Sequence, residues 1–388
     1  MADSDGEILL RRIAAYGRPA GSASEQAIRE LCARELRGAG FLVAERAFEY
    51  SAFPGLWGTP AVGLLLGIAA LWVATRAGSG AFGWGEVLAT AATLYAVGVL
   101  GWWLGRYGIM GLPIMRRHGV NLEGSRGLPK VWLVAHLDTK GQPISLLTRA
   151  ADVVLTLAAW VGILAVLAFA PNAVKLHWVV VLGWIAVIGA LPLVLSWVHH
   201  TGGGTGALDN ASGVATVIRA AALIAPDSPV GVLLTSAEEL GMAGARGWLA
   251  QRAVPERGVA INCDGVDDNG ELTCTISRDD GVFRSALAML AQRHADGEHV
   301  RVRRSLPGVL FDSVAFADRG WAAATLSRGT LRSLARVHTT ADTLDRLRGG
   351  SVEETARIVA ALAGSIIAVE CGGDTAVEEQ GQYGPTAD

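Results

Sequence analysis

Five short segments of the sequence carry histidine or carboxylate side chains at expected strand ends or in loops. They are His136-Leu137-Asp138, Asp209-Asn210-Ala211-Ser212-Gly213, Glu238-Glu239, Asp264 and His338-Thr339-Thr340-Ala341-Asp342. Taken singly, each has an ordinary explanation, such as a surface pair, a helix N-cap or a solvated turn. Together they offer nitrogen and oxygen donors without thiolate, a set that suits zinc and also accepts manganese or cobalt.

Such a donor set can hold two divalent cations that share one carboxylate. Two cations about 3.5–4 Å apart repel, so a carboxylate must bridge them, and they lower the pKa of a shared water from 15.7 toward about 7. A free carboxylate must then take the proton of that water. Glu238 and Glu239 can divide these tasks, since consecutive side chains point in different directions. Asp138 is placed to accept a hydrogen bond from the imidazole of His136 and so fix its tautomer.

The elements that position these residues are short apolar strands that alternate with amphipathic helices. Strands are predicted at residues 131–135, 230–234, 258–263, 272–276 and 322–326, and helices at 211–224, 241–252, 283–294 and 352–369. This alternation predicts an α/β sandwich with a largely parallel sheet. Ligands of such sheets bind beyond the carboxyl ends of the strands, where the five segments lie.

Four long stretches of the chain are almost free of charge. Residues 51–75, 87–105 and 153–174 contain no charged side chain, and residues 176–198 contain only His177 as an ionisable group. A membrane-spanning helix needs roughly 17–25 apolar residues, so we expect four spans in two hairpins. Buried core helices are the alternative, but such helices seldom run near 20 residues without a charge. Tryptophans suited to the interface lie near the expected ends: Trp57, Trp84, Trp178 and Trp197.

Two hairpins return the chain each time to the side that it left, so all polar segments lie on one side of the membrane. That side carries the more numerous basic residues near the spans: Arg106, Arg116, Arg117, Arg126, Lys130, Lys140 and Arg149, against Arg76 and Lys175 on the other. The positive-inside rule therefore predicts a multi-pass protein of the cell membrane with its polar domain in the cytoplasm.

Other features of the composition narrow the class of protein. The net charge of −3 offers no basic patch, so no nucleic-acid partner is expected. The N-terminus, MADSDGEILLRR, lacks the pattern of a signal peptide. The four cysteines have no metal-binding spacing and are too few for a disulfide framework, which fits a reducing compartment.

The order His-x-Asp, Asp-Asn-x-x-Gly, Glu-Glu, Asp, His-Thr-x-x-Asp resembles the co-catalytic zinc aminopeptidase family, which includes bacterial secreted aminopeptidases, glutamate carboxypeptidase and glutaminyl cyclases. The segment Gly17-Arg18-Pro19-Ala20-Gly21-Ser22, the helix after it and Gly40-Phe41 are similar to the start of that family. The resemblance covers residues 1–50, about 119–143 and 200–370. It implies a three-layer sandwich of the zinc exopeptidase type.

The resemblance also implies a role for each residue. Asp209 would bridge two zinc ions, His136 and Asp264 would complete one metal site, and Glu239 and His338 would complete the other. Glu238 would be the general base, and Asp138 would orient His136. These assignments name all seven expected site residues: Glu238 and Asp138 as catalytic groups, and His136, Asp209, Glu239, Asp264 and His338 as metal ligands.

Three features depart from the family pattern. Many relatives carry a Ser-Asp-His run late in the fold, whereas this chain has Phe311-Asp312-Ser313. Most relatives act outside the cytoplasm. The largest departure is the second hairpin, which lies between His136 and Asp209. Since an extended chain spans at most about 3.3–3.6 Å per residue, this insertion predicts that the metal site lies within roughly 30–50 Å of the bilayer and faces or flanks it.

We therefore expect a membrane-anchored, metal-dependent exopeptidase, an aminopeptidase that hydrolyses peptides with a water activated by two bridged zinc ions. A single-zinc glutaminyl cyclase-like acyltransferase and a catalytically inactive receptor or scaffold of the same fold are the alternatives; a four-helix transporter is disfavoured because the spans hold almost no ionisable residue. The expected organisation is a peptidase domain formed by residues 1–50, 106–150 and 199–370, hairpins at 51–105 and 151–198, and a disordered tail at 371–388.

Overall fold

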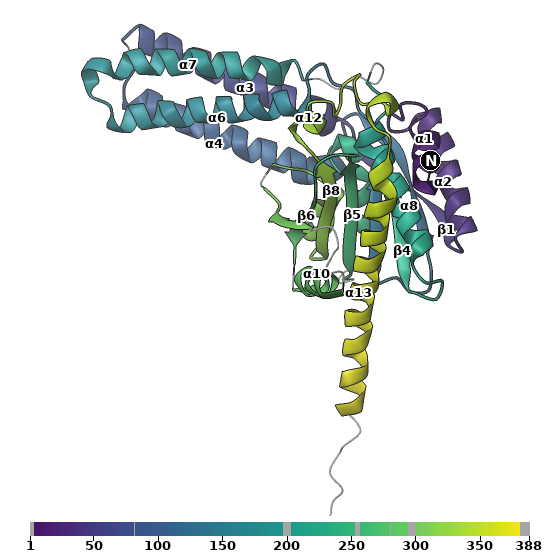
Figure 1. The fold of residues 1–388 in the computed structure, drawn as a ribbon. Helices are drawn as coiled ribbons and strands as arrows, with labels where there is room; N and C mark the ends of the chain where they lie inside the picture. Colours follow the sequence, from purple (N-terminus) through teal and green to yellow (C-terminus); the bar gives the residue numbers. More distant parts are fainter. Residues whose placement is uncertain are drawn as a thin grey trace, which may run out of the picture.

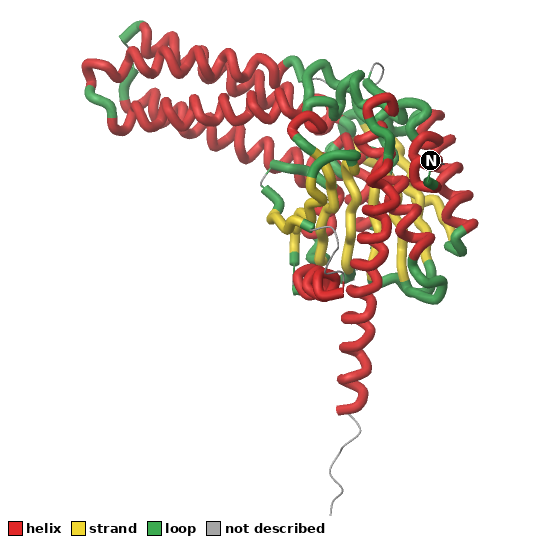
Figure 2. Tube along the Cα trace, in the orientation of Figure 1, coloured by secondary structure: helices red, strands yellow, loops and turns green. Residues whose placement is uncertain are grey.

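The protein consists of an α/β domain and a projecting arm of long helices (Figure 1). The structure is a computed structural model that describes residues 4–80, 82–196, 203–252, 257–279, 281–293, 300–306 and 308–380. Figure 2 shows the strands gathered in one sheet within the domain, with helices around it. The expected α/β class is therefore confirmed, together with helices that could form two membrane hairpins.

One mixed sheet forms the centre of the domain. Its strand order is β1-β2-β4-β3-β5-β8-β6-β7. The strands are β1 (Leu42–Ser51), β2 (Arg116–Ser125), β3 (Val131–His136), β4 (Val230–Thr235), β5 (Val259–Val266), β6 (Glu271–Arg278), β7 (Arg301–Arg304) and β8 (Ala322–Gly329). The central strands β4, β3, β5 and β8 pair in parallel, as does β7 with β6, whereas β1–β2, β2–β4 and β6–β8 are antiparallel. Parallel central strands bring the residues after β3, β4 and β5 to one edge of the sheet.

Helices cover both faces of this sheet, and alternation along β3 shows why. Leu133 belongs to the larger core, which includes residues of α1 (Asp5–Ile13), α2 (Ala23–Gly38), α8 (Gly213–Leu223), α10 (Val282–Arg293) and α13 (Gly350–Gln380). Trp132 and Val134 belong to the opposite core, with α9 (Ala243–Ala250) and α11 (Asp312–Asp318). Successive strand side chains point to opposite faces, so an apolar strand such as β3 needs cover on both sides. The result is a three-layer sandwich.

The arm consists of α3 (Phe53–Gly78), α4 (Trp84–Trp103), α6 (Leu146–Phe169) and α7 (Asn172–Val194). Within the described residues, these helices, with α4 prolonged to Gly111, are the four long and apolar enough to cross a membrane. Helix α7 packs against both α3 and α6. Gly63 permits a close approach, because a Cβ there would lie 2.7 Å from Cβ of Leu193. Trp57, Trp84 and Trp178 are exposed on the arm, whereas Trp197 lies outside the described residues.

Both hairpins leave the domain at the same edge of the sheet. The first is inserted between β1 and β2, which pair Ser51 with Arg116. Because β2 runs antiparallel to β4, its first residues lie toward the carboxyl end of β4. The second follows β3 directly, and only residues 137–145 connect His136 to α6. The arm therefore starts from the edge at which the candidate metal ligands lie.

Several boundaries differ from those expected. Helix α6 begins at Leu146 rather than near residue 151, because Ser145 caps it and Arg149 is accommodated in its first turns. Strands β1 and β2 were not among the predicted strands, since Glu45, Arg46 and Glu49 interrupt the apolar residues of β1 and β2 is largely polar. Helix α13 spans Gly350–Gln380 and so includes the first residues of the tail expected at 371–388. Residues 381–388, and His294 of the expected helix 283–294, lie outside the described residues.

Candidate metal centre

Each candidate ligand is placed by the end of a central element. His136 is the last residue of β3, and Asp264 lies near the end of β5. Glu238 and Glu239 form a single helical turn directly after β4. Asp209 precedes α8, and His338 follows α12 (Leu331–Leu334). The structure thus brings together all five residues that the sequence suggests as ligands, in two groups that share Asp209.

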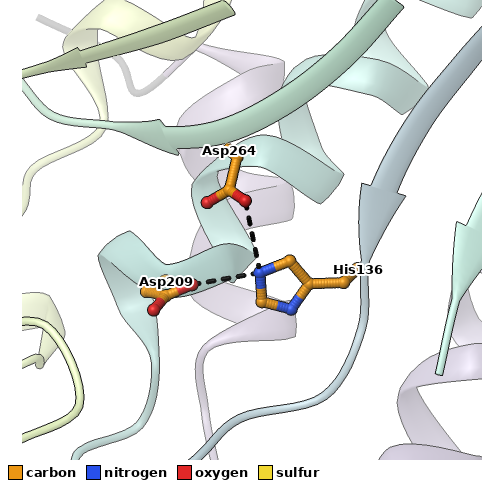
Figure 3. Close-up of side chains that lie close together, drawn as sticks. All are labelled: His136, Asp209 and Asp264. Carbon is orange, nitrogen blue, oxygen red and sulfur yellow. Dashed lines mark ion pairs between the residues drawn. The ribbon is translucent and has the colours of Figure 1, made fainter. Parts of the chain in front are cut away.

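The first group surrounds His136, which is 1% exposed (Figure 3). Its Nε2 lies 3.0 Å from Oδ1 of Asp209 and 3.8 Å from Oδ2 of Asp264. Oε2 of Glu238 lies 4.0 Å from the same nitrogen. Two carboxylates and one imidazole therefore point at one small volume, with Glu238 at its margin. We call this group the His136 half.

The second group surrounds His338. Its Nε2 lies 2.9 Å from Oδ2 of Asp209 and 3.1 Å from Oε1 of Glu239. Nζ of Lys140 lies 2.7 Å from the other carboxylate oxygen of Glu239, Oε2. Glu239 therefore directs one oxygen to the histidine and one to the lysine. We call this group the His338 half. Asp209 joins the halves by giving one oxygen to each histidine.

The side chains around these groups are held from outside. Asp138 accepts hydrogen bonds from the backbone N–H groups of Glu238 and Glu239, at 3.0 and 3.2 Å. Asp342 accepts them from the N–H groups of Leu208 and Asp209, at 2.7 and 3.0 Å. These two buried carboxylates fix the backbone of the segments that carry the acidic candidates.

The outer nitrogens of the two histidines also have partners. Nδ1 of His136 lies 3.0 Å from the backbone oxygen of Asp138, and 3.6 Å from Oδ1 of its carboxylate. The nearer partner is thus the main chain, whereas the sequence suggests the side chain. Nδ1 of His338 lies 3.1 Å from Oε1 of Gln142. In both rings, an Nδ1 proton given to an oxygen leaves Nε2 with a lone pair that faces the carboxylates.

Nearby positive charge stabilises two of the buried carboxylates of the cluster in their ionised form. Burial disfavours a charged imidazole at His136, but the nearby carboxylates of Asp209, Asp138 and Asp264 outweigh it and raise the pKa of His136 well above its ordinary value. Burial opposes ionisation of Asp209, yet both histidines hold its pKa well below the ordinary range. Against the same burial, His338 and Lys140 lower the pKa of Glu239 to about 2.

Glu238 differs from the other acids in this respect. Burial, reinforced by the charges of Glu239, Asp312 and Asp264, raises the pKa of Glu238 well above its ordinary value. Asp312 is fully buried; burial raises its pKa to about 7, and its Oδ2 accepts a hydrogen bond from the hydroxyl of Thr235. Glu238 therefore has the environment of a carboxylate that takes up a proton readily, as a general base must.

The residues present fit a pair of divalent cations. Each half offers one imidazole nitrogen and two carboxylate oxygens whose donor atoms lie within 4.8 Å of one another. Oε1 of Glu239 is buried without a hydrogen bond, although it lies close to His338. Buried carboxylates at this density are costly unless a cation neutralises them. Nitrogen and oxygen donors in this proportion suit zinc.

The sequence did not point to three residues that contact this cluster. Lys140 and Gln142 lie in the loop after β3, and Asp342 occurs in the quoted His-Thr-x-x-Asp segment without an assigned role. Their partners are far away along the chain, up to 196 residues for Gln142 and His338. Only Asp342 had a local signal, its fixed distance from His338.

A pocket of about 340 Å³ opens beside the His338 half. Lys140 lines it together with small and hydroxylated residues: Gly17, Pro19, Thr139, Gly141, Gly203, Gly204, Thr205, Thr340 and Thr343. Pockets of this size accommodate small ligands or the end of a peptide. The pocket is formed in part by the two chain segments that connect the second hairpin to the domain.

Solved structures of similar fold include an aminopeptidase from Aneurinibacillus sp. strain AM-1, with 16% identity, a TM-score of 0.50, and coverage of 94% of this chain and 92% of that one. They include BSAP, a zinc aminopeptidase from Bacillus subtilis, with 14% identity, a TM-score of 0.54, and coverage of 92% and 93%. A glutaminyl cyclase from Fimbriiglobus ruber has 13% identity, a TM-score of 0.50, and coverage of 95% and 97%. At such identities the likeness shows the fold.

No curated protein sequence matches the chain significantly. The sequence model of Peptidase family M28 matches residues 193–363, a stretch that contains Asp209, Glu238, Glu239, Asp264 and His338. The suspected relationship to zinc aminopeptidases and glutaminyl cyclases is thereby confirmed. Residues 193–363 are thus similar to Peptidase family M28, which supports a metallopeptidase.

Proposed function

We propose that the protein is a membrane-anchored aminopeptidase that uses two zinc ions. One observation carries the proposal: the two carboxylate oxygens of Asp209 face two different histidines, Oδ1 toward His136 and Oδ2 toward His338. A carboxylate divided in this way suits a bridge between two cations. A single-metal site would need only one of the two groups.

The proposal includes the roles expected for all seven site residues. His136, Asp209 and Asp264 would hold one ion, and Asp209, Glu239 and His338 the other. When bound, the ions would supply Lewis acidity toward a peptide carbonyl and lower the pKa of a water. Glu238 would take the proton of that water and pass it to the leaving amine, as its raised pKa favours. Asp138 would hold the turn that carries Glu238 and Glu239.

The experiment compares the purified wild-type protein with Glu238→Gln, a variant of nearly equal volume. Both are assayed on aminoacyl-nitroanilides with zinc, manganese or cobalt, and their metal content is measured by mass spectrometry. We expect about two metal ions per chain in both proteins and a kcat lower by about 10²–10⁴-fold in the variant, because proton transfer is lost while the ligands remain.

Other results would contradict parts of this proposal. Equal activity in the two proteins would remove Glu238 as the base. One tightly bound zinc per chain, with cyclisation of peptides that begin with glutamine, would indicate the cyclase-like reaction instead. A wild-type protein that binds metal but acts on no peptide would indicate a receptor or scaffold.

The position of the pocket supports a role for the membrane in substrate access. Lys140 and Gly141 lie just before the second hairpin, and Gly203 and Gly204 follow it closely in the chain. We therefore propose that peptides reach the site beside the bilayer, for example after release by other membrane proteases. Peptides with and without an apolar end are compared in detergent and in liposomes. We expect liposomes to favour the apolar peptides, and unchanged selectivity would contradict this expectation.

We also propose an orientation in the membrane. The excess of basic residues near the spans on the domain side favours a cytoplasmic peptidase domain. Exposure of a C-terminal tag to protease in intact and in permeabilised cells tests this orientation. Cleavage of the tag in intact cells would reverse it.

A further inference from the structure

Gln142 occupies a position that the metal cluster alone does not explain. It is 8% exposed and lies between β3 and α6, in the segment that leads into the second hairpin. Its backbone N–H donates to the carbonyl of His338 at 2.8 Å, and its Oε1 lies 3.1 Å from Nδ1 of the same histidine. Gln142 thus contacts both the backbone and the ring of His338.

The two ends of the second hairpin hold the amide of Gln142 in one orientation. The guanidinium of Arg149, in α6, donates to Oε1 of Gln142 at 2.9 Å. Nε2 of Gln142 donates to the backbone carbonyl of Ser196, just after α7, at 3.1 Å. Arginine can only donate and a carbonyl can only accept, so a flipped amide would lose both bonds.

This orientation decides which nitrogen of His338 carries the proton. An amide oxygen cannot donate, so Nδ1 of His338 must be the donor in its contact with Gln142. The neutral ring then presents the lone pair of Nε2 to Asp209 and Glu239. A metal-binding histidine needs this tautomer, and such outer partners are worth about 10–100-fold in metal affinity.

We infer that the second hairpin is a working part of the metal site: through Gln142, which Arg149 and Ser196 hold from the two ends of the hairpin, it orients His338 for metal binding. Gln142 is a positioning residue in this scheme. The inference rests on the proposed function, because it requires a metal at His338. It adds that the arm, besides anchoring the domain, sets the affinity of one of two metal sites.

The same connecting segment supports the inference a second time. Lys140, two residues before Gln142, contacts Oε2 of Glu239, the other ligand that belongs to the His338 half alone. Residues 137–145 therefore supply outer partners for both. In the His136 half, the nearest outer partner of the imidazole is the backbone oxygen of Asp138, which belongs to the same segment but lies only two residues after His136, the last residue of β3.

The test measures metal binding by the full-length protein in detergent. Zinc affinities and stoichiometry are obtained by chelator competition, and the absorption spectrum of the Co²⁺ form reports the geometry of each site. The variants are Gln142→Met, which removes the hydrogen bonds at similar length; Gln142→Glu, which keeps an acceptor for His338; Arg149→Met; and Arg149→Lys. Arg76→Met is the control, because Arg76 contacts Glu86 at the far end of the first hairpin.

We expect Gln142→Met to lower the affinity for one of the two zinc ions by about 10–100-fold and to leave the affinity for the other unchanged. The absorption spectrum of the Co²⁺ form should change. Gln142→Glu should restore the weakened affinity. Arg149→Met should show a smaller loss, Arg149→Lys should recover part of it, and Arg76→Met should behave as wild type.

Three results would overturn the inference. Unchanged zinc affinities in Gln142→Met would show that Gln142 does not orient His338. An equal loss of both ions, without rescue by Gln142→Glu, would indicate general damage to the domain. A wild-type protein that binds no divalent metal would instead refute the proposed function, on which the inference depends.

Discussion

The two halves of the candidate metal centre contain similar donors but are supported by different parts of the molecule. In the His136 half, His136 and Asp264 lie at the ends of β3 and β5, which pair with each other in the centre of the sheet. In the His338 half, Glu239 lies in the helical turn after β4 and His338 follows α12. They contact Lys140 and Gln142, in the loop that leads to the arm. One half therefore depends on the sheet, the other on the attachment of the second hairpin.

This difference suggests how two apolar helical hairpins can be inserted into a peptidase-like domain while its candidate site stays assembled. The two hairpins interrupt the chain at the carboxyl edge of the sheet, where loops are long and carry function. The apolar strands keep their pairing, so the sheet itself holds His136 and Asp264 of the His136 half in place. The His338 half is contacted by Lys140 and Gln142, in the segment that leads into the inserted hairpin.

The largest effect is expected from a change that both halves share. Asp209→Asn removes the one carboxylate that faces both histidines, while an amide of similar shape keeps the packing. We expect the affinity for both metal ions to fall by more than the roughly 10–100-fold that removal of an outer hydrogen-bond partner costs. Activity should fall close to background. Metal content after dialysis, with circular dichroism to confirm folding, provides the measurement. Retention of one tightly bound ion would show that the halves are independent.

The sequence predicted the His136 half of the centre more completely than the His338 half. His136, Asp209, Glu238 and Asp264 could be found because each lies next to a readable strand or helix start. His338 has no adjoining strand; it was singled out as a loop histidine, and its role as a ligand came from the resemblance to the family. Hydrophobic patterns in the sequence show where strands end and helices begin, so they identify polar residues at those positions.

The outer partners were missed for a physical reason. Lys140 and Gln142 lie in a loop with no hydrophobic period, and their contacts to Glu239 and His338 span 99 and 196 residues of sequence. Such contacts depend on where the hairpin returns the chain. The same limit applies to β1 and β2, polar strands without a continuous apolar run that pair around the first hairpin.

An intermediate effect is expected at Lys140. Its ammonium group and Glu239 are both buried, at 9% and 5% side-chain exposure, and are 2.7 Å apart. Removing one member of a buried ion pair costs up to about 3–5 kcal/mol. Lys140→Met should therefore lower the melting temperature of the chelator-treated protein, and zinc should reduce the difference because a bound cation replaces the lost charge.

The pH at which this comparison is made matters. The pKa of Glu239 is lowered to about 2 from 4.5, so the stability that it contributes is present above about pH 4.5 and is lost as the pH falls toward 2. Melting is therefore measured at pH 7, with Lys140→Arg as the matched control that keeps the charge. An equal difference with and without zinc would mean that no metal binds next to Glu239.

The smallest effect is expected at Glu25, which lies beyond Asp138 on the outer side of the cluster. Glu25 is 1% exposed and accepts a hydrogen bond from the N–H of Gly21 at 2.7 Å. Burial, and then the charge of Asp138, raise its pKa from 4.5 to about 7. A raised pKa in the folded state means that the stabilising contribution is complete below about pH 4.5 and is lost as the pH rises through 7.

Glu25→Gln keeps an acceptor for Gly21 but never ionises. The variant should match the wild type near pH 4.5 and exceed it above pH 8 by on the order of 1–3 kcal/mol, since each pKa unit corresponds to about 1.4 kcal/mol. Melting temperatures across pH 4.5–8.5, with and without zinc, give the measurement. The gain should shrink with zinc, because a nearby cation offsets the charge of Asp138. A gain that does not vary with pH would show that folding does not raise the pKa of Glu25.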